Sequence, residues 1–390
     1  MDLLVLGGGF GGLAAATELR RLLPDAAIRL VDRADAFFMG FAKLWELGDV
    51  RPLSHGTRPL ANLAAHDIEF IRADITGIDP ANRVVDTSVG HLTADGLVIA
   101  LGGGTNRAHL DLLAGAGAHD LYDPAALPAM KAAIDATTSG RIVVSILGGP
   151  FRCPPAPYEA AMIVRDRLVS SGHRDDVEIV MTTPQPMTLP AAGVDASAFL
   201  AGHLDRYGIV LREQHVVSGA VKEPPIGSGA RPRSTIHFGN GSDVDADVWL
   251  AVPASAPLAV LSTDELAGPS GWIEPDRDTF RTSHERVYAI GDCTHVPNVL
   301  GALPKAGVFA AGEGLTAAAN LAADLGVGDG GSFHGRGYCF LELPDRHVAL
   351  VQGDFYADPI DVELTEATRE RFDEKLAYEL DKLDRWLPAG

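Results

Sequence analysis

The sequence predicts an α/β fold with two successive parallel sheets, and three observations support this prediction. Short apolar segments alternate with segments of helical periodicity along most of the 390 residues, which is typical of parallel sheets covered by helices. A glycine-rich turn joins the first apolar segment directly to the first helical one. Glycine-rich and proline-rich stretches at 102–104 and 224–235 indicate linkers, and the length suits two or three domains.

The expected elements follow this alternation in order. Strands are expected at residues 2–6, 27–32, 68–72, 96–101, 141–147, 177–182, 246–252 and 286–290. Helices are expected at residues 10–22, 125–137, 157–171, 194–206 and 305–324. A glycine run at 326–332 precedes a tail of different character, with strands expected at 338–343 and 347–355 around a turn at 344–346, then a charged helix over 364–387.

Charge and composition argue against several kinds of partner. The chain has 52 acidic and 32 basic residues, a net charge of −20, so nucleic acid and anionic lipid would repel it. No apolar run reaches the roughly 18–20 residues of a membrane helix, and no signal peptide precedes the first strand. We therefore expect a cytoplasmic protein. Its three cysteines are too few for a scaffold held together by disulfides.

The turn at residues 7–12 has the spacing of a nucleotide-binding site. Gly7, Gly9 and Gly12 fit G-x-G-x-x-G, in which the glycines allow a tight turn, close approach of a pyrophosphate and close helix packing. Asp32 follows Gly12 by 20 residues at the end of the next apolar strand, where an acid binds an adenosine ribose. The candidate cofactor contacts in this region are Gly7, Gly9, Phe10, Gly11, Gly12, Asp32 and the adjacent Arg33.

These features together predict two Rossmann-like nucleotide-binding domains, the second inserted into the first, plus a small C-terminal hairpin and helix. The first domain is expected at 1–104 and 240–330, and the second at 105–239. The hairpin and its amphipathic helix are expected at 331–390.

Three further segments resemble the flavoproteins with two dinucleotide-binding domains. The segment at 282–292 resembles their second FAD fingerprint, whose aspartate, here Asp292, binds the ribityl chain. The segment at 94–103 resembles the strand that leads back toward FAD, and the segment at 303–307 resembles the helix start beneath the flavin pyrimidine. The resemblance covers nearly the whole chain and implies FAD as cofactor. The further contacts it implies are Gly102, Gly291, Asp292 and Lys305, although a plain surface lysine is an equal interpretation of Lys305.

The corresponding turn of the second domain lacks the features that bind NAD. Prolines and a cysteine interrupt the sequence GGPFRCPPAPYE at residues 148–159, and proline has no N–H to donate to a phosphate. The next strand ends in Thr182 and Thr183, without a carboxylate for an adenosine ribose. We therefore expect no dependence on a pyridine nucleotide.

Two cysteines lie in segments with a more specific resemblance. Residues 151–159 closely resemble the segment that holds a redox cysteine, here Cys153, in the sulfide:quinone oxidoreductase and flavocytochrome c sulfide dehydrogenase family. Residues 337–342 resemble the C-terminal strand that holds the second, here Cys339. The resemblance implies a Cys153–Cys339 redox pair, with two unrelated buried thiols as the alternative. Many of these oxidoreductases use a third, upstream cysteine, which this chain lacks; Cys293 is expected only to fill space beside the cofactor.

The resemblance implies FAD-dependent oxidation of sulfide, or of a small thiol, with a quinone as electron acceptor. Hydrosulfide would attack the Cys153–Cys339 disulfide, and the thiolate chemistry calls for a depressed cysteine pKa, to which a helix starting near Pro157 would contribute. Glu159 is the candidate general base, and a glutamate placed in a first helical turn by the helix dipole is a nearly equal alternative.

The C-terminal helix is amphipathic in the sequence. Its expected apolar side carries Phe372, Leu376, Leu380, Leu383 and Leu387, with Trp386 close by, and its expected polar face carries Asp373, Glu374, Glu379, Asp381 and Asp384. Because a membrane-surface helix favours basic residues, packing on its own domain or on a second subunit is favoured over peripheral contact with the inner face of a membrane. We expect a homodimer.

Three other functions remain open on the sequence. A type II NADH dehydrogenase shares the FAD domain and the quinone acceptor but needs the missing NAD fingerprint and no cysteine pair. An NAD(P)H-dependent disulfide or persulfide reductase fails on the same fingerprint. A non-catalytic FAD-binding partner protein would not need both cysteines.

Overall fold

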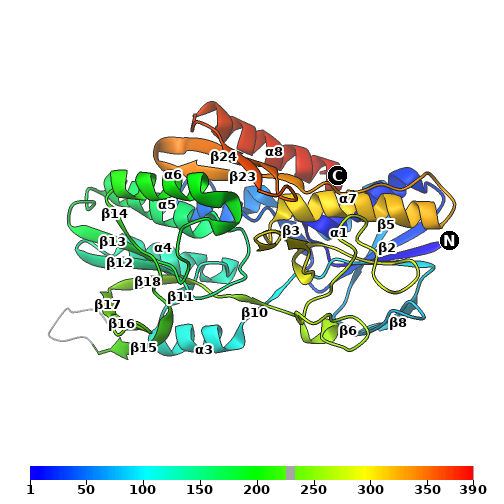
Figure 1. Ribbon diagram of the computed structural model, residues 1–390, viewed down its shortest axis with the longest axis horizontal. Coiled ribbons are helices and arrows are strands. Elements are labelled where there is room, and N and C mark those ends of the chain that lie inside the picture. The colour runs from blue at the N-terminus through cyan, green and yellow to red at the C-terminus, as the bar shows by residue number, and fades with distance from the viewer. Residues whose placement is uncertain (225–232, 390) are drawn as a thin grey trace.

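The first domain contains the parallel sheet that the sequence predicts. The computed structural model describes residues 1–224 and 233–389, and its first sheet has the strand order β20-β9-β1-β2-β5, parallel throughout (Figure 1). The strands are β1 (Asp2–Leu6), β2 (Ala27–Asp32), β5 (Ile68–Arg72), β9 (Gly96–Ile99) and β20 (Val287–Ala289). Since β1 ends at residue 6 and β20 begins at residue 287, the first domain is built from two parts of the chain that are far apart in sequence.

Alternation of side chains along β1 explains how this sheet is covered. Leu3 and Val5 pack against one face with helices α1 (Phe10–Leu22) and α7 (Gly307–Asp324), and Leu4 and Leu6 point to the other face. An antiparallel sheet that the sequence analysis missed covers that second face. Its strands are β6 (Ile75–Asp79), β7 (Val84–Thr87) and β8 (Gly90–Thr93).

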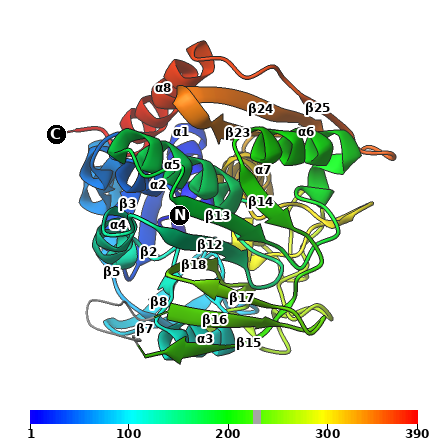
Figure 2. The same cartoon turned by 90° about the vertical axis from the view of Figure 1, so that its left-hand side faces the viewer.

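The second domain repeats the arrangement with the strand order β11-β18-β12-β13-β14. Figure 2 shows helices α5 and α6 above this sheet and α3 with β15–β17 below it. The parallel strands are β11 (His119–Asp120), β12 (Gly140–Ile146), β13 (Val177–Thr182), β14 (Ile209–Arg212) and β18 (Val248–Val252). The covering elements are α3 (Arg107–Ala116), α4 (Leu127–Asp135), α5 (Ala156–Ser171), α6 (Gly193–Arg206), β15 (Val217–Glu223), β16 (Arg233–Phe238) and β17 (Asp243–Ala246).

The predicted domain boundary at residue 239 is wrong for two strands, β17 and β18, because β17 pairs with β16 of the second domain. The sequence assigns β18 to the first domain, but β18 lies inside the second sheet, hydrogen-bonded between β11 and β12, with all five residues buried. An apolar five-residue strand fits the middle of either sheet, so its neighbours are decided by tertiary pairing. The predicted linkers also differ from the structure. Residue 104 of the first begins strand β10, and residues 225–232 of the second lie outside the described residues, whereas 233–235 belong to β16.

Several short elements complete the two domains. They are β3 (Ala36–Phe38) with β4 (Thr57–Pro59), α2 (Ala42–Leu47), β10 (Gly104–Thr105) with β19 (Ser255–Ala256), and β21 (Pro297–Asn298) with β22 (Gly301–Ala302). β10 pairs with the distant β19, β3 pairs with β4, β21 forms a tight hairpin with β22, and α2 packs against α4 and α5.

The C-terminal unit lies across both domains, as the top of Figure 1 shows. The expected hairpin is present as β23 (Arg336–Leu343) and β24 (His347–Asp354), but a third strand, β25 (Asp361–Leu364), occupies the expected start of the helix, so α8 runs only over Glu370–Trp386. Leu341 packs in the core of the second domain, whereas Val348 packs in that of the first. The C-terminal unit therefore contributes to the hydrophobic cores of both domains and connects them.

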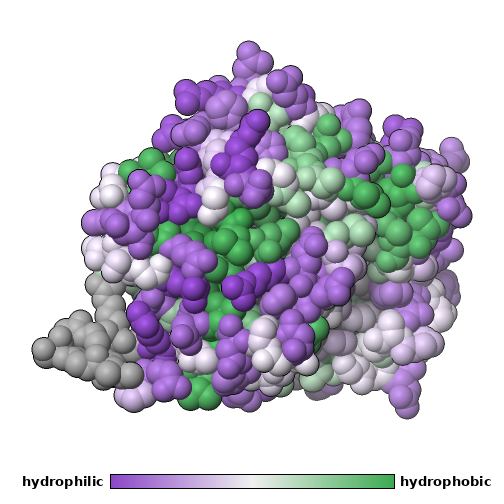
Figure 3. All heavy atoms as spheres, turned by 60° about the vertical axis from the view of Figure 1, so that its left-hand side comes forward, coloured by the Kyte–Doolittle hydropathy of each residue, from purple (hydrophilic) through white to green (hydrophobic). Residues whose placement is uncertain are grey.

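The surface reflects the acidic composition. In Figure 3, hydrophilic side chains cover most of the visible face, and apolar ones gather in a central area and in a second area toward the right. None of the helices in the described part of the chain combines the length and the apolar character needed to cross a membrane.

Candidate active site

A cavity of about 410 Å³ runs from the N-terminus of α1 to the two cysteines expected to be redox-active. Asp32 lies at one end, and Cys153 and Cys339 lie at the other. Its walls come from the first domain, from the loop before α5 and from the C-terminal unit. The cavity therefore forms only where all three parts of the chain meet.

The glycines of the first turn have the geometry that a bound pyrophosphate requires. Gly7 has φ +106°, and a Cβ at Gly12 would stand 1.9 Å from the carbonyl oxygen of Gly7, so the turn and the helix can only meet without side chains. Gly9 has no atom within 4 Å of the place of a Cβ, and Gly9, Phe10 and Gly11 line the cavity. The backbone N–H groups at the start of α1 thus face open space suited to phosphate.

Two alanine substitutions separate cofactor binding from packing. In Gly9→Ala the new methyl group meets no protein atom, so we expect an unchanged free energy of unfolding and a marked loss of bound flavin. In Gly12→Ala the methyl group meets backbone, so we expect a destabilisation of about 1–3 kcal/mol together with flavin loss. Flavin content and urea unfolding measure the two effects. Gly115→Ala, an exposed position in α3 with free space around it, is the matched control. Full flavin content in Gly9→Ala would contradict the assignment.

The ribose end of the cavity is organised by Asp32. Its carboxylate accepts hydrogen bonds from the backbone N–H of Gly8 at 2.6 Å and of Ala34 at 2.8 Å, and it lines the cavity. Arg33, expected beside it as a contact, has an exposed side chain outside the cavity lining.

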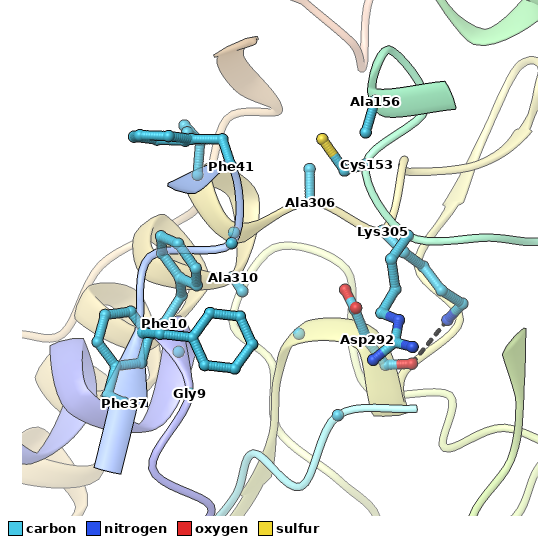
Figure 4. Close-up of a pocket in the computed structure, with 18 of the residues that line it drawn as sticks. Gly9, Phe10, Phe37, Phe41, Cys153, Ala156, Asp292, Lys305, Ala306 and Ala310 are labelled. Atoms are coloured by element: carbon cyan, nitrogen blue, oxygen red, sulfur yellow. Dashed lines mark hydrogen bonds between the residues drawn. The ribbon is translucent and has the colours of Figure 1, made fainter. Parts of the chain in front are cut away.

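Gly102, Gly291, Asp292 and Lys305 all line the cavity, and Figure 4 shows Asp292 beside Lys305. Burial raises the pKa of the Asp292 carboxyl, and the nearby Lys305 opposes this rise. The Lys305 ammonium does not stand free. It donates to the carbonyl oxygens of Asp292 at 2.7 Å and Thr294 at 3.0 Å, and it lies 3.6 Å from the ring centre of Trp272. Lys305 is therefore a buried anchor for the Asp292 turn rather than a surface lysine.

Cys153 is held in a constrained loop that faces this cavity. Its φ is +49°, a left-handed conformation that is unusual for a residue with a side chain. Its backbone N–H donates to the carbonyl oxygen of Lys305 at 2.7 Å, and its own carbonyl accepts from Ala156 at 2.9 Å. Figure 4 shows Cys153 across the cavity from the aromatic residues Phe10, Phe37 and Phe41. The loop therefore presents the sulfur in one position.

Cys339 lies on β23 and lines the same cavity. Both cysteines are free thiols in this structure. Burial raises the pKa of Cys339, and the neighbouring Cys153 contributes to the rise, which places the two sulfurs within electrostatic reach of each other. The structure therefore brings together the two residues that the sequence resemblance pairs.

The thiol pKa values differ from the sequence expectation. Burial raises the pKa of Cys153 to about 12, Glu159 adds to the rise, and Lys375, the Ala156 N–H and Lys43 act in the opposite direction. The start of α5 thus acts in the expected sense, but burial outweighs it. A depressed pKa was expected, and in the free thiol form the reverse holds.

Glu159, the expected general base, belongs to a buried charge cluster. Its carboxylate accepts from the backbone N–H of Glu342 at 2.8 Å and from the Lys375 ammonium at 3.2 Å. Lys375 also donates to Glu342 at 2.8 Å, and the indole N–H of Trp45 donates to the same carboxylate at 2.8 Å. Burial raises the pKa of Glu159. Burial by itself lowers the pKa of Lys375, but the two carboxylates outweigh it, so that pKa is raised.

The predicted apolar stripe of α8 is wrong in part. The buried residues of this helix are Phe372, Lys375, Glu379, Leu383 and Trp386, whereas Leu380 is 48% exposed. Glu379, expected on the polar face, is buried and paired with Arg51. Glu379 was predicted to face outward because it is charged, and the buried position of Lys375 was not predicted. Their spacing of three and seven residues from Phe372 was the signal that could have found them.

Aromatic residues form the cavity wall beside Lys375. Phe340 and Tyr378 have ring centres 5.7 Å apart, and Phe41 and Tyr378 are 6.4 Å apart. All three line the cavity near Cys339. This end can accept a flat apolar molecule against π surfaces.

A second cavity, of about 350 Å³, reaches Cys339 from the side of the second domain. Its lining is largely apolar and includes the turn at 149–155, where an NAD fingerprint would lie, and Leu303 and Phe355 opposite. Cys339 and Lys305 line both cavities.

Cys293 has the packing role expected for it. Its side chain is 1% exposed, and its thiol donates to the carbonyl oxygens of Ile290 at 3.1 Å and Ile99 at 3.6 Å. It lines neither cavity.

Two Rossmann-like domains, a nucleotide cradle and paired cysteines at the end of one cavity define a flavin-dependent disulfide oxidoreductase. The residues present fit FAD, because the glycine turn, Asp32 and Asp292 follow one another along a single elongated cavity. Residues 1–314 match the family described as pyridine nucleotide-disulphide oxidoreductase, and the chain belongs to this family.

Similar proteins share a narrower activity in their names. The chain is 26% identical over 349 residues to the sulfide-quinone reductase of Aquifex aeolicus, covering 83% of this chain and 76% of that protein. It is 21% identical over 308 residues to the mitochondrial sulfide:quinone oxidoreductase of Mus musculus, covering 76% of this chain and 66% of that protein, just under two thirds of its length. The solved structure of the sulfide:quinone oxidoreductase from Aquifex aeolicus matches with a TM-score of 0.85 and 22% identity, over all of this chain and 92% of that one. The resemblance predicted from the sequence is thereby confirmed.

Proposed function

We propose that this protein oxidises sulfide, or a small thiol, through a Cys153–Cys339 redox disulfide, with FAD as cofactor and a quinone as electron acceptor. The observation that carries the proposal is the placing of Cys153 and Cys339, from segments 186 residues apart, on the wall of one cavity that begins at the nucleotide turn. The names of the similar proteins support the choice of sulfide and quinone.

The chemical step uses the cysteines alone. Hydrosulfide attacks the disulfide, a new S–S bond forms on one cysteine as a persulfide, and the old S–S bond breaks to leave a thiolate on the other. The disulfide gains the two electrons that the sulfide loses. FAD, bound in the first cavity, supplies the two-electron carrier between this pair and the acceptor.

The buried charge cluster of Glu159, Glu342 and Lys375 is the proposed group that accepts and returns protons. The charge of Glu159 raises the pKa of Cys153, and burial raises the pKa of Glu159 itself. The Glu159 carboxyl can therefore exchange a proton closer to neutral pH than a free glutamate can. Lys375 holds it in place through the 3.2 Å contact. The sequence analysis named Glu159 as the candidate general base, and the neighbouring Lys375 and Glu342 complete the buried charge cluster around it.

The aromatic wall is the proposed quinone side. Phe41, Phe340 and Tyr378 present apolar surface close to Lys375, whose ammonium can donate to a quinone oxygen. The second cavity is the proposed route for the sulfur compound, because it reaches Cys339 from the opposite side of the chain.

The decisive experiment compares two reductants. Purified oxidised protein is mixed anaerobically with stoichiometric sulfide or, separately, with NADH, and the absorbance band of oxidised flavin is followed. We expect rapid loss of the band with sulfide alone, and its return on addition of a soluble quinone. Loss with NADH alone would replace the proposal by an NADH:quinone oxidoreductase. No loss with either compound would indicate a non-catalytic flavin-binding protein.

The partners and location predicted from the sequence remain proposals. We propose a cytoplasmic homodimer whose contact with a membrane, where it occurs, is peripheral. Helix α8 uses its buried face for the C-terminal unit and directs Asp373, Glu374 and Asp384 outward, which favours protein contacts over anionic lipid.

A further inference from the structure

Lys43 is a cation in the cavity wall that the sequence analysis did not single out. It lies on α2 between the apolar residues Ala42 and Leu44, and its ammonium donates to the carbonyl oxygen of Tyr122 at 2.8 Å. Within residues 1–224 and 233–389 it makes this hydrogen bond but no ion pair with a carboxylate. In a chain with 52 acidic residues, a half-buried lysine in a cavity wall without an acidic contact calls for an explanation.

Tyr122 connects Lys43 to the cysteine loop. The Lys43 ammonium lies 5.0 Å from the centre of the Tyr122 ring. The Tyr122 hydroxyl donates to the carbonyl oxygen of Arg152 at 2.5 Å and lies 3.4 Å from that of Cys153. Lys43, Tyr122, Arg152 and Cys153 all line the first cavity. The lysine and the cysteine therefore approach the same cavity from two sides of one tyrosine.

Lys375, a second cation near Cys153, is already neutralised. Lys375 contacts the carboxylates of Glu159 and Glu342, so this cluster carries one negative charge when all three groups are ionised. Such a cluster opposes a thiolate at Cys153. Lys43 faces acids at longer range, Asp120 and Asp123, and the Asp120 carboxylate is itself held by the backbone N–H of Tyr122 at 2.8 Å.

We propose that the Lys43 ammonium is the positioning charge that stabilises the Cys153 thiolate in the first cavity. The inference rests on the proposed role of Cys153 as a redox thiol and deepens it. A thiolate in this buried loop needs a nearby positive charge, and among the residues that the structure describes no carboxylate contacts the Lys43 ammonium. Arg152 and Lys305 also line the cavity. The Lys305 ammonium is held by two backbone carbonyls, and the Arg152 guanidinium lies 5.6 Å from the centre of the Tyr122 ring.

The ionisation of Lys43 gives the proposal a pH dependence. Burial, followed by the nearby Arg152, lowers the pKa of Lys43 to about 8. The amine therefore becomes neutral above this pH, and its support for the thiolate fades as the pH rises. Glu159 also faces Cys153, and its charge opposes the thiolate, whereas Lys375 supports the thiolate. Burial raises the pKa of Tyr122, so its hydroxyl is uncharged in this pH range. The adjacent Arg152 lines the same cavity.

The test measures the thiol directly and needs no turnover. The flavin-loaded protein is reduced, freed of reductant anaerobically and exposed to iodoacetamide between pH 6 and pH 9.5, and alkylation of the Cys153 and Cys339 peptides is followed by mass spectrometry. In Lys43→Met we expect Cys153 alkylation at pH 7.5 to slow about tenfold, the equivalent of one pKa unit. Lys43→Arg should match the unaltered protein at pH 7.5 and exceed it at pH 9, because arginine keeps its charge.

Two comparisons make the outcome specific. Lys222→Gln removes one charge at an exposed site of the second domain and should leave both profiles unchanged. Cys339 alkylation should change little in either Lys43 variant, whereas a general disturbance of the cavity would alter it as well. Equal Cys153 profiles in unaltered and Lys43→Met protein would overturn the inference, as would Cys153 alkylation in Lys43→Arg that is no faster at pH 9 than in the unaltered protein. Sulfide reduction of the flavin is measured on the oxidised protein, so failure of the proposed function is seen separately.

Discussion

Replacing either Cys153 or Cys339 by serine is expected to slow sulfide-dependent flavin reduction by at least about 100-fold, because a hydroxyl can neither form nor leave from an S–S bond. Both sulfurs line the cavity, and each is needed once, one to carry the persulfide and the other to leave as thiolate. Stopped-flow absorbance after anaerobic mixing with sulfide measures the rate. The flavin content should stay normal, because neither side chain belongs to the nucleotide turn.

Cys293→Ser is the matched control. It makes the same substitution in a cysteine that lies in the core and lines neither cavity, so the variant should reduce at the unaltered rate. Reduction of both the Cys153 and the Cys339 variants at the unaltered rate would show that the sulfur chemistry does not pass through the pair.

The second large effect is expected from Lys375→Met. Removal of the ammonium leaves the Glu159 and Glu342 carboxylates buried without their cation, and breaking a buried ion pair in this way costs about 3–5 kcal/mol. Since Lys375 ties α8 to both α5 and β23, the C-terminal unit should loosen first. Urea unfolding measures the loss. Lys382→Met, a partly exposed lysine on the same helix, should change stability by less than about 0.5 kcal/mol.

The pH dependence of this variant has a definite sign. The pKa of Glu159 is already raised by burial, and Lys375 opposes that rise, so the pKa rises further without the lysine. A carboxyl whose folded pKa lies above its unfolded value of about 4.3 favours folding when protonated and loses that stability as the pH rises through the folded pKa. The penalty in Lys375→Met should therefore shrink toward acidic pH. Adding Glu159→Gln and Glu342→Gln should recover most of the stability, and a penalty that does not vary with pH would exclude this account.

Sequence reasoning located the nucleotide half of the site because its requirements are local. The spacing of Gly7, Gly9 and Gly12 and the position of Asp32 depend only on neighbouring strands, one turn and one helix. In the structure, Gly9 and Asp32 line one cavity, and Gly7 and Gly12 meet in one tight turn. The same holds for the order of most strands and helices. The small sheet of β6, β7 and β8 was missed because its strands are short and largely exposed or half exposed, without a strong period.

The charged half of the site was not accessible in the same way. Lys43 and Lys375 are ordinary lysines in the sequence, and nothing local shows that both line a cavity or that Lys375 is buried. Glu159 was named, but its partners lie 183 and 216 residues farther along the chain. The placing of α8 also changed which of its residues count as inward.

By itself, the sequence determined the α/β class, the first nucleotide turn and the two cysteine segments, because each depends on residue types at fixed spacing within a short segment. Only the tertiary structure decided that β18 belongs to the second sheet, that the cysteines share a cavity and that their thiol pKa values are raised. These properties depend on burial and on charges brought together by packing, and burial is a property of the folded chain rather than of any one segment.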